Sequence, residues 1–387
     1  MRKNKKKSFK QPAPSTLKKL SERWPKGIKQ LCADLEQKGF HPEAALAIED
    51  ASLLSFEIEK FSLREWKELK FPTSITNLES KMEAFSFFSS LKNIPEEIGR
   101  FGLVFLDKKF QGRWPMPGQI FLKTENVEAA FDYILKELWV PEWTFAARSG
   151  ASKTAIYKNV KIAKSALVEP HVLIGPMTEI SDLVVIESGT RIGANVKIGK
   201  GTRIGANSRI ADHTTIGENC MLHSHVAIGG QGFGTVKYPG DDVSVQRIHV
   251  GNVVIGDNVR MGSHVSVDRG VLTSTRVMAH SVIDNIVQIA HNCEVGEGAL
   301  ICSFVGLSGS TVLGKNVTIA GMVGTKGHVS IGDNVVIAAQ SGVLNDIASG
   351  SQVKGYPPKP ILQALKIQAL VDRLPEFYDR LKKVEVK

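Results

Sequence analysis

The sequence predicts a mainly β protein: a left-handed parallel β-helix of hexapeptide repeats, preceded by a small α/β domain and followed by a C-terminal α-helical segment. Three observations support this prediction. An aliphatic residue recurs at every sixth position from Ile156 onward, turn-forming Gly, Asn and Asp stand between the aliphatics, and both flanking regions lack the period. Helices require a period near 3.6 and half-exposed strands a period of two, so a period of six indicates stacked hexapeptide coils.

The period supplies the core of the predicted β-helix. Each hexapeptide gives one short strand and one tight turn, and three hexapeptides close one coil of about 18 residues. The aliphatic side chain of each repeat points inward and stacks on its counterparts in neighbouring coils. Gly and Asn fill the turns because they accept positive φ at little cost. The first unbroken run comprises Ile156, Ile162, Val168, Ile174, Ile180, Ile186, Ile192, Ile198, Ile204, Ile210, Ile216, Leu222 and Ile228.

The register breaks twice. After Ile228 a glycine-rich run opens a loop that lasts to about Asn252, and from Val267 to Val277 the spacing is ten residues instead of six. From Val277 the period holds through Val343. Insertions in a solenoid form loops on one face, often the binding face. We therefore expect the working region in the middle of the β-helix.

Charge and composition indicate the remaining domains. Residues 1–30 hold eleven Lys or Arg against the single acid Glu22, so the net charge of +10 belongs to a tail that we expect to be disordered. The alternative to a merely solvated tail is that it is weakly attracted to anionic lipid or RNA. For the folded body we expect no nucleic acid partner. Residues 31–150 lack the period and predict an α/β domain. The β-helix then covers residues 151–349, and residues 350–387 form a linker and a helix that Pro375 kinks or divides.

The sequence also bears on the cellular compartment. No apolar stretch follows the basic tail and none is long enough to span a bilayer, so we expect neither a signal peptide nor a transmembrane segment. The four cysteines show no C-x-x-C pairing and are expected to be free thiols, partly in the core: Cys32, Cys220, Cys293 and Cys302. These features predict a cytoplasmic protein, with peripheral contact to the inner membrane left open.

The most specific motif runs from Ile283 to Cys293. It reads Ile-Asp-Asn-Ile-Val-Gln-Ile-Ala-His-Asn-Cys and resembles a nearly identical stretch in the UDP-3-O-(3-hydroxyacyl)glucosamine N-acyltransferases of lipid A biosynthesis. Further agreement lies in the tripeptides 232–234 and 268–270 and in the stretch 327–342. The resemblance covers roughly residues 166–360.

The resemblance implies an enzyme of lipopolysaccharide synthesis that moves a 3-hydroxyacyl chain from acyl carrier protein to the 2-amino group of a UDP-3-O-acylglucosamine. The acyl donor is the phosphopantetheine thioester of the carrier protein, and no other cofactor and no metal is implied. The family is homotrimeric, with active sites in grooves between neighbouring solenoids, and we expect the same here. Basic residues of the C-terminal segment suit an acidic carrier protein, although a solvated helix face explains them equally well.

The resemblance also assigns roles to single residues. His291 is implied as the general base, because transfer to an amine releases a proton that an imidazole is suited to take. Gly309 stands 18 residues later, one coil on if the register is regular, and is implied to give its backbone N–H to the oxyanion. His328 matches a second active-site histidine that contacts the sugar phosphates or the acyl substrate. Asp284 could orient His291 or serve as a turn aspartate, and Asn292 is expected to contact the substrate.

The α/β domain departs from the family pattern. The family binds uridine through an F-x-x-N-P-K-Y segment, and the best local match is the run from Val104 to Phe110. Phe105, Asp107, Lys109 and Phe110 are therefore the substrate-binding candidates, although an ionised Asp can only accept hydrogen bonds where the family's Asn also donates. Two alternatives to the implied activity remain: an N-acyltransferase for another amino sugar, and a solenoid scaffold that binds partners without catalysis.

Overall fold

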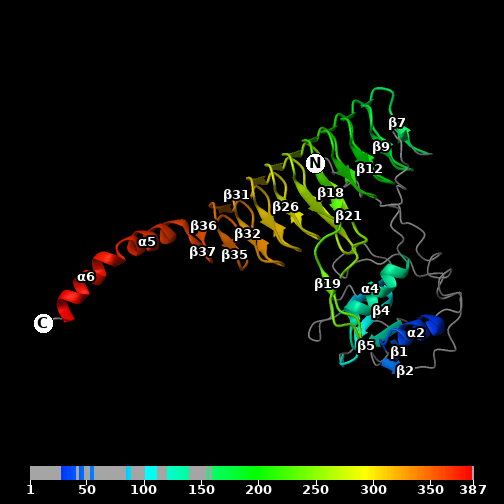
Figure 1. Ribbon diagram of the computed structural model, residues 1–387, viewed down its shortest axis with the longest axis horizontal. Helices are drawn as coiled ribbons and strands as arrows, with labels where there is room; N and C mark the ends of the chain where they lie inside the picture. Colours follow the sequence, from blue (N-terminus) through cyan, green and yellow to red (C-terminus); the bar gives the residue numbers. More distant parts are fainter. Residues whose placement is uncertain are drawn as a thin grey trace, which may run out of the picture. The chain divides into compact units, whose positions relative to one another are not determined.

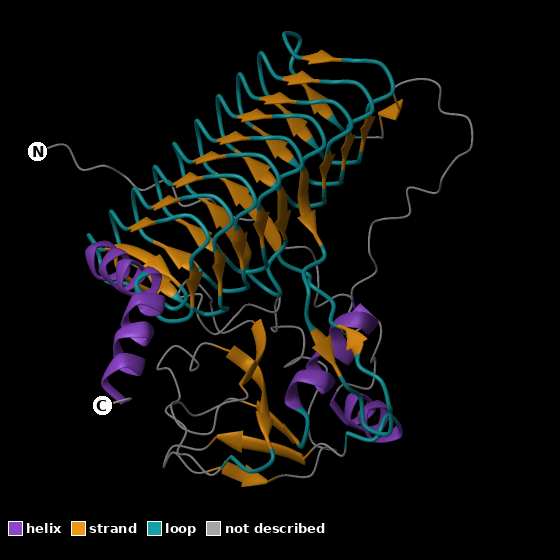
Figure 2. Cartoon of the chain, turned by 60° about the vertical axis from the view of Figure 1, so that its left-hand side comes forward, coloured by secondary structure: helices purple, strands orange, loops and turns teal. Residues whose placement is uncertain are grey.

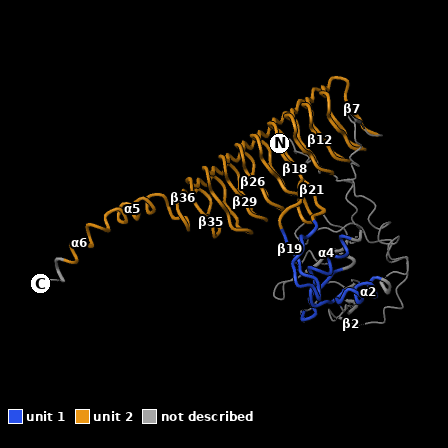
Figure 3. Tube along the Cα trace, in the orientation of Figure 1, with its two compact units in different colours: residues 1–140, 234–248 blue, residues 141–233, 249–387 orange. Residues whose placement is uncertain are grey.

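The computed structural model divides the chain into two compact units. Residues 1–140 and 234–248 form the first unit, and residues 141–233 and 249–387 form the second (Figure 3). The predictions for the basic tail concern residues outside the described part of the chain. The described residues are 28–40, 43–47, 53–55, 84–88, 101–110, 120–138, 155–156 and 159–385.

The first unit combines a mixed β-sheet with helices. Helices α2 (Ile28–Gln37) and α4 (Val127–Leu138) bury apolar side chains such as Leu35 and Phe131. Within the described residues the strand order is β2 (Leu53–Ser55), β1 (Glu43–Ala47), β5 (Ile120–Thr124), β4 (Phe101–Asp107), β3 (Ala84–Phe88). Strands β3, β4 and β5 run parallel, and β1 runs antiparallel to β2 and β5.

A hairpin of β19 (Thr235–Val236) and β20 (Val245–Gln246) also belongs to this unit, although it interrupts the sequence of the solenoid. The buried carboxylate of Asp132 in α4 holds it. This carboxylate accepts the hydroxyl of Tyr238 at 2.6 Å and the N–H of Ile248 at 2.8 Å, and it lies 3.0 Å from Nζ of Lys136. Burial and the bond to Asp132 raise the pKa of Tyr238. The sequence predicts only a loop in this segment.

The second unit is a β-solenoid of stacked coils whose strands run parallel (Figures 1 and 2). Strands pair with the strands one coil away, so that Ile180 lies beside Ile162 and Ile198. In a typical strand such as β12 (Arg191–Ile192) the first residue is exposed and the second is buried. The six-residue period is therefore confirmed as the core: its aliphatic members from Ile174 through Val343 line one continuous apolar column, and Thr325 is buried in the same register.

Within the described residues the solenoid has three sheets of nine, eleven and ten strands. The nine-stranded sheet contains β7 (Lys161–Ile162), β10 (Glu179–Ile180), β13 (Lys197–Ile198), β16 (Thr215–Ile216), β21 (Asn252–Ile255), β24 (Ser274–Val277), β27 (Glu294–Val295), β30 (Val312–Leu313) and β33 (Ser330–Ile331). The eleven-stranded sheet contains β8 (Leu167–Val168), β11 (Val185–Ile186), β14 (Arg203–Ile204), β17 (Met221–Leu222), β22 (Arg260–Met261), β25 (Val282–Ile283), β28 (Leu300–Ile301), β31 (Thr318–Ile319), β34 (Val336–Ile337), β36 (Gln352–Gly355) and β37 (Pro358–Pro360). The ten-stranded sheet contains β6 (Ala155–Ile156), β9 (Leu173–Ile174), β12 (Arg191–Ile192), β15 (Arg209–Ile210), β18 (Ala227–Gly230), β23 (Ser266–Asp268), β26 (Gln288–Ile289), β29 (Gly306–Leu307), β32 (Gly324–Thr325) and β35 (Gly342–Val343).

Both interruptions of the period fall at one corner of the solenoid. The first lies between β18 and β21 and the second between β23 and β24, and in each case the chain passes from the ten-stranded to the nine-stranded sheet. We call the connections between these two sheets from the first interruption to β33 the loop corner. Within the second unit it comprises residues 231–233, 249–251, 269–273, 290–293, 308–311 and 326–329. The expectation that the insertions gather on one face is thus confirmed.

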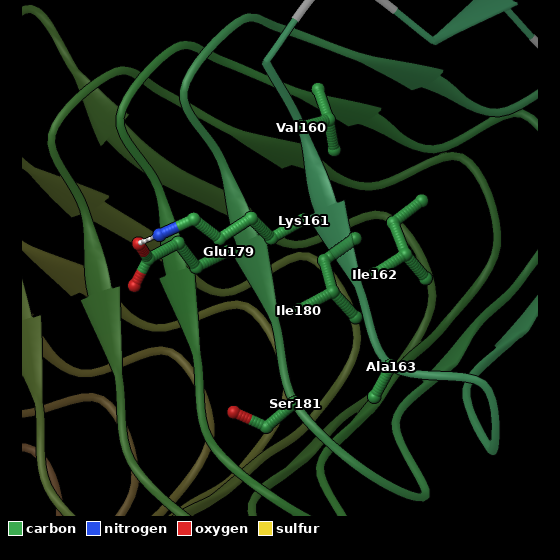
Figure 4. A pocket seen from close by; sticks show the side chains of 7 residues that line it. All are labelled: Val160, Lys161, Ile162, Ala163, Glu179, Ile180 and Ser181. Atoms are coloured by element: carbon green, nitrogen blue, oxygen red, sulfur yellow. Dashed lines mark hydrogen bonds and ion pairs between the residues drawn. The ribbon is translucent and has the colours of Figure 1, made fainter.

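The two ends of the solenoid differ. At the C-terminal end β36 pairs with β34 and turns back antiparallel as β37, after which α5 (Ile361–Asp372) and α6 (Leu374–Glu385) follow. The helix expected here is thus divided at Arg373, just before Pro375. At the other end, within the part of the chain that the structure describes, β7 has a paired strand on one side, and Nζ of Lys161 pairs with Glu179 of the next coil at 2.8 Å (Figure 4). Among the described helices, none is long and apolar enough to cross a membrane.

Candidate active site

The sequence-predicted catalytic residues meet at the loop corner. His291, Gly309 and His328 lie in the turns that follow β26, β29 and β32, in three successive coils. The N–H of Ser310 donates to the carbonyl oxygen of His291 at 2.9 Å, and the N–H of His328 donates to that of Gly309 at 3.0 Å. The constant coil of 18 residues therefore places Gly309 directly beside His291, while His328 stands one position further along its own turn.

Gly309 makes room for the imidazole of His291. A Cβ at Gly309 would lie 2.6 Å from both Cε1 and Nε2 of that ring, closer than real Cβ contacts allow. Glycine is therefore required by close approach and not by its backbone, since its φ is not in the left-handed region. The Nε2 edge of the ring faces the backbone of Gly309. A substrate atom that contacts Nε2 is thereby close to this peptide group.

Asn292 fixes the other edge of the ring. Its Oδ1 accepts the N–H of Val271 at 2.9 Å and its Nδ2 donates to Oγ1 of Thr273 at 2.9 Å, which sets the orientation of the amide. Nδ1 of His291 lies 3.2 Å from the same Oδ1. Because that oxygen can only accept, Nδ1 carries the proton and the lone pair is left on Nε2. Asn292 thus orients the histidine, and the substrate contact that the sequence suggests for it stays a prediction.

Two residues of the first interruption also pack against the ring, His249 and Gly232, and the sequence assigned a role in the site to neither, although Gly232 belongs to the tripeptide 232–234. The ring centroid of His249 lies 5.0 Å from that of His291, with an interplanar angle of 56°. Gly232 packs against both rings, because a Cβ there would lie 3.0 Å from Nε2 of His249 and 3.0 Å from Cβ of His291. Their positions could have pointed to them, because Gly232 lies at the start and His249 at the end of the first interruption.

Arg269 and Asp268 lie next to the site in the preceding coil. The buried guanidinium of Arg269 donates through Nε to the carbonyl oxygen of Gly229 at 2.9 Å and through Nη2 to that of Asp212 at 3.3 Å. It thereby ties the second interruption to the start of the first. Burial raises the pKa of the Asp268 carboxyl to about 6, against the opposing effect of the hydrogen bond from Gln288 at 2.9 Å.

Asp284 lies at a different corner, in the turn that follows β25 of the eleven-stranded sheet. Its carboxylate accepts hydrogen bonds from the hydroxyl of Ser303 and from the backbone and side chain of Asn285. The bond from Ser303 is the main cause that lowers the pKa of Asp284. These contacts are those of the turn aspartate, the second of the two alternatives that the sequence left open.

The substrate-binding candidates of the first unit divide into two kinds. The side chains of Phe105 and Phe110 are buried in the core of this unit, and the ring of Phe105 packs edge-to-face against Phe131 at 5.7 Å. Asp107 and Lys109 lie in the turn after β4, where Oδ1 of Asp107 accepts the N–H of Lys109 at 2.8 Å. In this structure the aromatic candidates thus serve the core, and only the two polar candidates reach solvent.

The thiols match the prediction from the sequence. All four cysteines are free, with Cys32, Cys220 and Cys293 buried and Cys302 exposed. Burial raises the pKa of Cys293, two residues from the candidate base, to about 12. A thiol that stays protonated at neutral pH is not a nucleophile. We therefore assign Cys293 to the apolar core.

Sequence comparison identifies the relatives of the chain. The family model for bacterial transferase hexapeptide repeats (six repeats) matches residues 183–216 and 195–230. A UDP-3-O-acylglucosamine N-acyltransferase of Campylobacter lari is 54% identical over 155 residues, which are 40% of this chain and 48% of the relative. That of Thermosynechococcus vestitus is 48% identical over 159 residues, 41% of this chain and 47% of the relative.

The chain is similar to UDP-3-O-acylglucosamine N-acyltransferases. In each match it spans less than half of the relative's length. Among solved structures, the UDP-N-acetylglucosamine acyltransferase from Campylobacter jejuni matches with 25% identity and a TM-score of 0.41, over 52% of this chain and 73% of that one. The matches to the sequence relatives confirm the resemblance that the Ile283–Cys293 motif predicts.

Proposed function

We propose that the protein is an N-acyltransferase of lipid A biosynthesis. It moves a 3-hydroxyacyl chain from the thioester of acyl carrier protein to the 2-amino group of UDP-3-O-(3-hydroxyacyl)glucosamine. The observation that carries the proposal is the held imidazole of His291, whose Nδ1 lies at Asn292 and whose Nε2 faces Gly309. The similarity to relatives named for this reaction supports the choice of substrate.

The geometry suits each step of such a transfer. The amine nitrogen attacks the thioester carbon while Nε2 of His291 takes the proton that the amine releases. The carbonyl oxygen then becomes an oxyanion, and the peptide N–H of Gly309 is the group we assign to it. When the C–S bond breaks, the imidazolium returns its proton to the departing thiolate. The products are the amide and the free thiol of the carrier, and the enzyme is unchanged.

We propose that His328 contacts the substrate and takes no part in the proton transfer. Its side chain is exposed and its φ of 59° is held by the turn, one coil beyond Gly309. A histidine at this place can contact the sugar phosphates or the acyl carbonyl. For the nucleotide, Asp107 and Lys109 are the remaining solvent-facing candidates in the first unit.

Two further parts of the proposal concern partners. Exposed basic side chains on α5 and α6 would attract an acidic carrier protein, among them Lys366, Arg380 and Lys382. Exposed apolar side chains in three successive coils, Ile286, Phe304 and Met322, form a ridge suited to association with other copies of the chain. We propose a homotrimer in the cytoplasm, which sedimentation equilibrium would test through the mass of the particle.

The decisive experiment is acyl transfer from 3-hydroxyacyl carrier protein to UDP-3-O-acylglucosamine with His291→Asn. We expect kcat to fall at least 100-fold, because the variant lacks a base. His280→Asn is the matched control: His280 is an exposed turn histidine at another corner, and Asn accepts its φ of 62°. Full activity of His291→Asn would refute the proposal. A panel of amino sugars tests the acceptor, and binding without turnover by the wild type would instead indicate a scaffold.

A further inference from the structure

The first interruption contains a buried histidine, His249, that lies next to the candidate base His291. His249 is completely buried, although it ends a long loop. The side chain of Gln231 clamps its backbone: Oε1 of Gln231 accepts the N–H of His249 at 2.9 Å, and Nε2 of Gln231 donates to the carbonyl oxygen of His249 at 3.1 Å. The two roots of the loop are thus locked together beside His291.

The loop roots are also tied to the second interruption. The N–H of Val250 donates to the carbonyl oxygen of Val271 at 2.9 Å, and that of Gly251 donates to the carbonyl oxygen of Gly270 at 3.0 Å. The N–H of Val271 in turn donates to Oδ1 of Asn292. One set of hydrogen bonds therefore fixes both the residue that follows His249 and the amide that orients His291.

We propose that His249 is a positioning residue that acts through His291. Its ring packs against the imidazole as a rigid wall, while the backbone of Gly309 closely approaches Cε1 and Nε2 of the same imidazole. Together these contacts hold the ring of His291 in one orientation, with Nδ1 at Asn292 and Nε2 turned to the reacting atoms. Without the wall the ring can rotate about χ2, and the lone pair is then presented at the wrong place for part of the time.

This role rests on the proposed function for its kinetic consequence but not for its geometry. A packing wall depends on the shape of the ring and not on its nitrogens. His249→Phe keeps a flat ring and His249→Ala removes it. Gln231→Ala leaves both rings in place and releases only the clamp, at a half-buried position where the change should not prevent folding.

Two readouts test the proposal. In the acyl-transfer assay we expect His249→Ala to lower kcat 10- to 100-fold with KM within twofold of wild type, because a misplacement of about 1 Å costs on that scale. His249→Phe should stay within fivefold of wild-type kcat, and Gln231→Ala should lose several-fold. The control is His264→Asn, which removes one ring of a stacked histidine pair with the same 5.0 Å separation at another corner.

The second readout needs no substrate. The ¹⁵N chemical shifts of the His291 ring should show a protonated Nδ1 and an unprotonated Nε2 in the wild type, in His249→Phe and in His264→Asn. In His249→Ala the two shifts should move towards their average, as the ring leaves Asn292. If this dependence on His249 is found in a protein that transfers no acyl group, the proposed reaction is wrong while the positioning role stands.

Three results would overturn the positioning role. One is an unchanged His291 tautomer in a folded His249→Ala. Another is wild-type kcat in both His249→Ala and Gln231→Ala. The third is a loss in His249→Phe as large as that in His249→Ala, because the nitrogens of His249 and not its shape would then be required. If His249→Ala gives no cooperative unfolding transition, Gln231→Ala and His249→Phe decide the question.

Discussion

Substitution of Gly309 by alanine probes the contact on which the candidate site depends. The added Cβ would lie 2.6 Å from Cε1 and Nε2 of His291, so the ring must move by roughly 0.8 Å to reach an ordinary contact of 3.4 Å. The backbone of Gly309 lies outside the left-handed region, and alanine adopts it without strain. The variant should therefore fold while its imidazole is displaced.

A displacement of that size should cost about 100-fold in kcat, or about 2.7 kcal/mol in the activation free energy. The assay is steady-state acyl transfer, with thermal unfolding by circular dichroism as the check on folding. Gly321→Ala is the matched control, because the nearest atom to its added Cβ is the carbonyl oxygen of Ser303 at 3.4 Å, at another corner. A folded Gly309→Ala with activity within threefold of wild type would show that the position of this ring is not what limits the reaction.

The remaining predictions concern stability. Burial raises the pKa of Asp268 to about 6 from an ordinary value of 3.8, so the charged form costs the folded state on the order of 3 kcal/mol. This cost is absent below pH 4 and grows as the pH rises towards and through 6. In urea unfolding, the free energy of unfolding of Asp268→Asn should therefore increase relative to that of the wild type between pH 4.5 and 7.5. A difference between the two proteins that does not change with pH would contradict burial of this carboxyl as the cause. Asp132→Ala should destabilise the first unit by about 3 kcal/mol in calorimetry, because three donors lose a buried acceptor. Glu128→Ala removes an exposed ion pair with Arg247 and should lower the free energy of unfolding by less than about 0.5 kcal/mol. If Glu128→Ala and Asp132→Ala destabilised the protein equally, the buried hydrogen bonds of Asp132 would not be the cause.

Part of the site follows from the repeat and part does not. The register is unbroken from Val277 to Val343, so the spacing of 18 residues between His291 and Gly309 converts directly into adjacent positions. His249 lies inside the first interruption, and the second interruption separates it from His291, so counting residues in steps of six cannot place it. The burial of Phe105 and Phe110 is likewise invisible in a short motif, because it depends on α4 and the sheet that pack around them.

The sequence alone determined the solenoid, its core and the corner that carries the histidines. It could do so because each coil contacts only its neighbours, and a local period is then sufficient to specify the tertiary contacts. Only the tertiary structure decided how the base is held. The orientation of the His291 ring is set by Asn292, Gly309 and His249, and the loops that bring them together are fixed by long-range hydrogen bonds that leave no periodic trace in the chain.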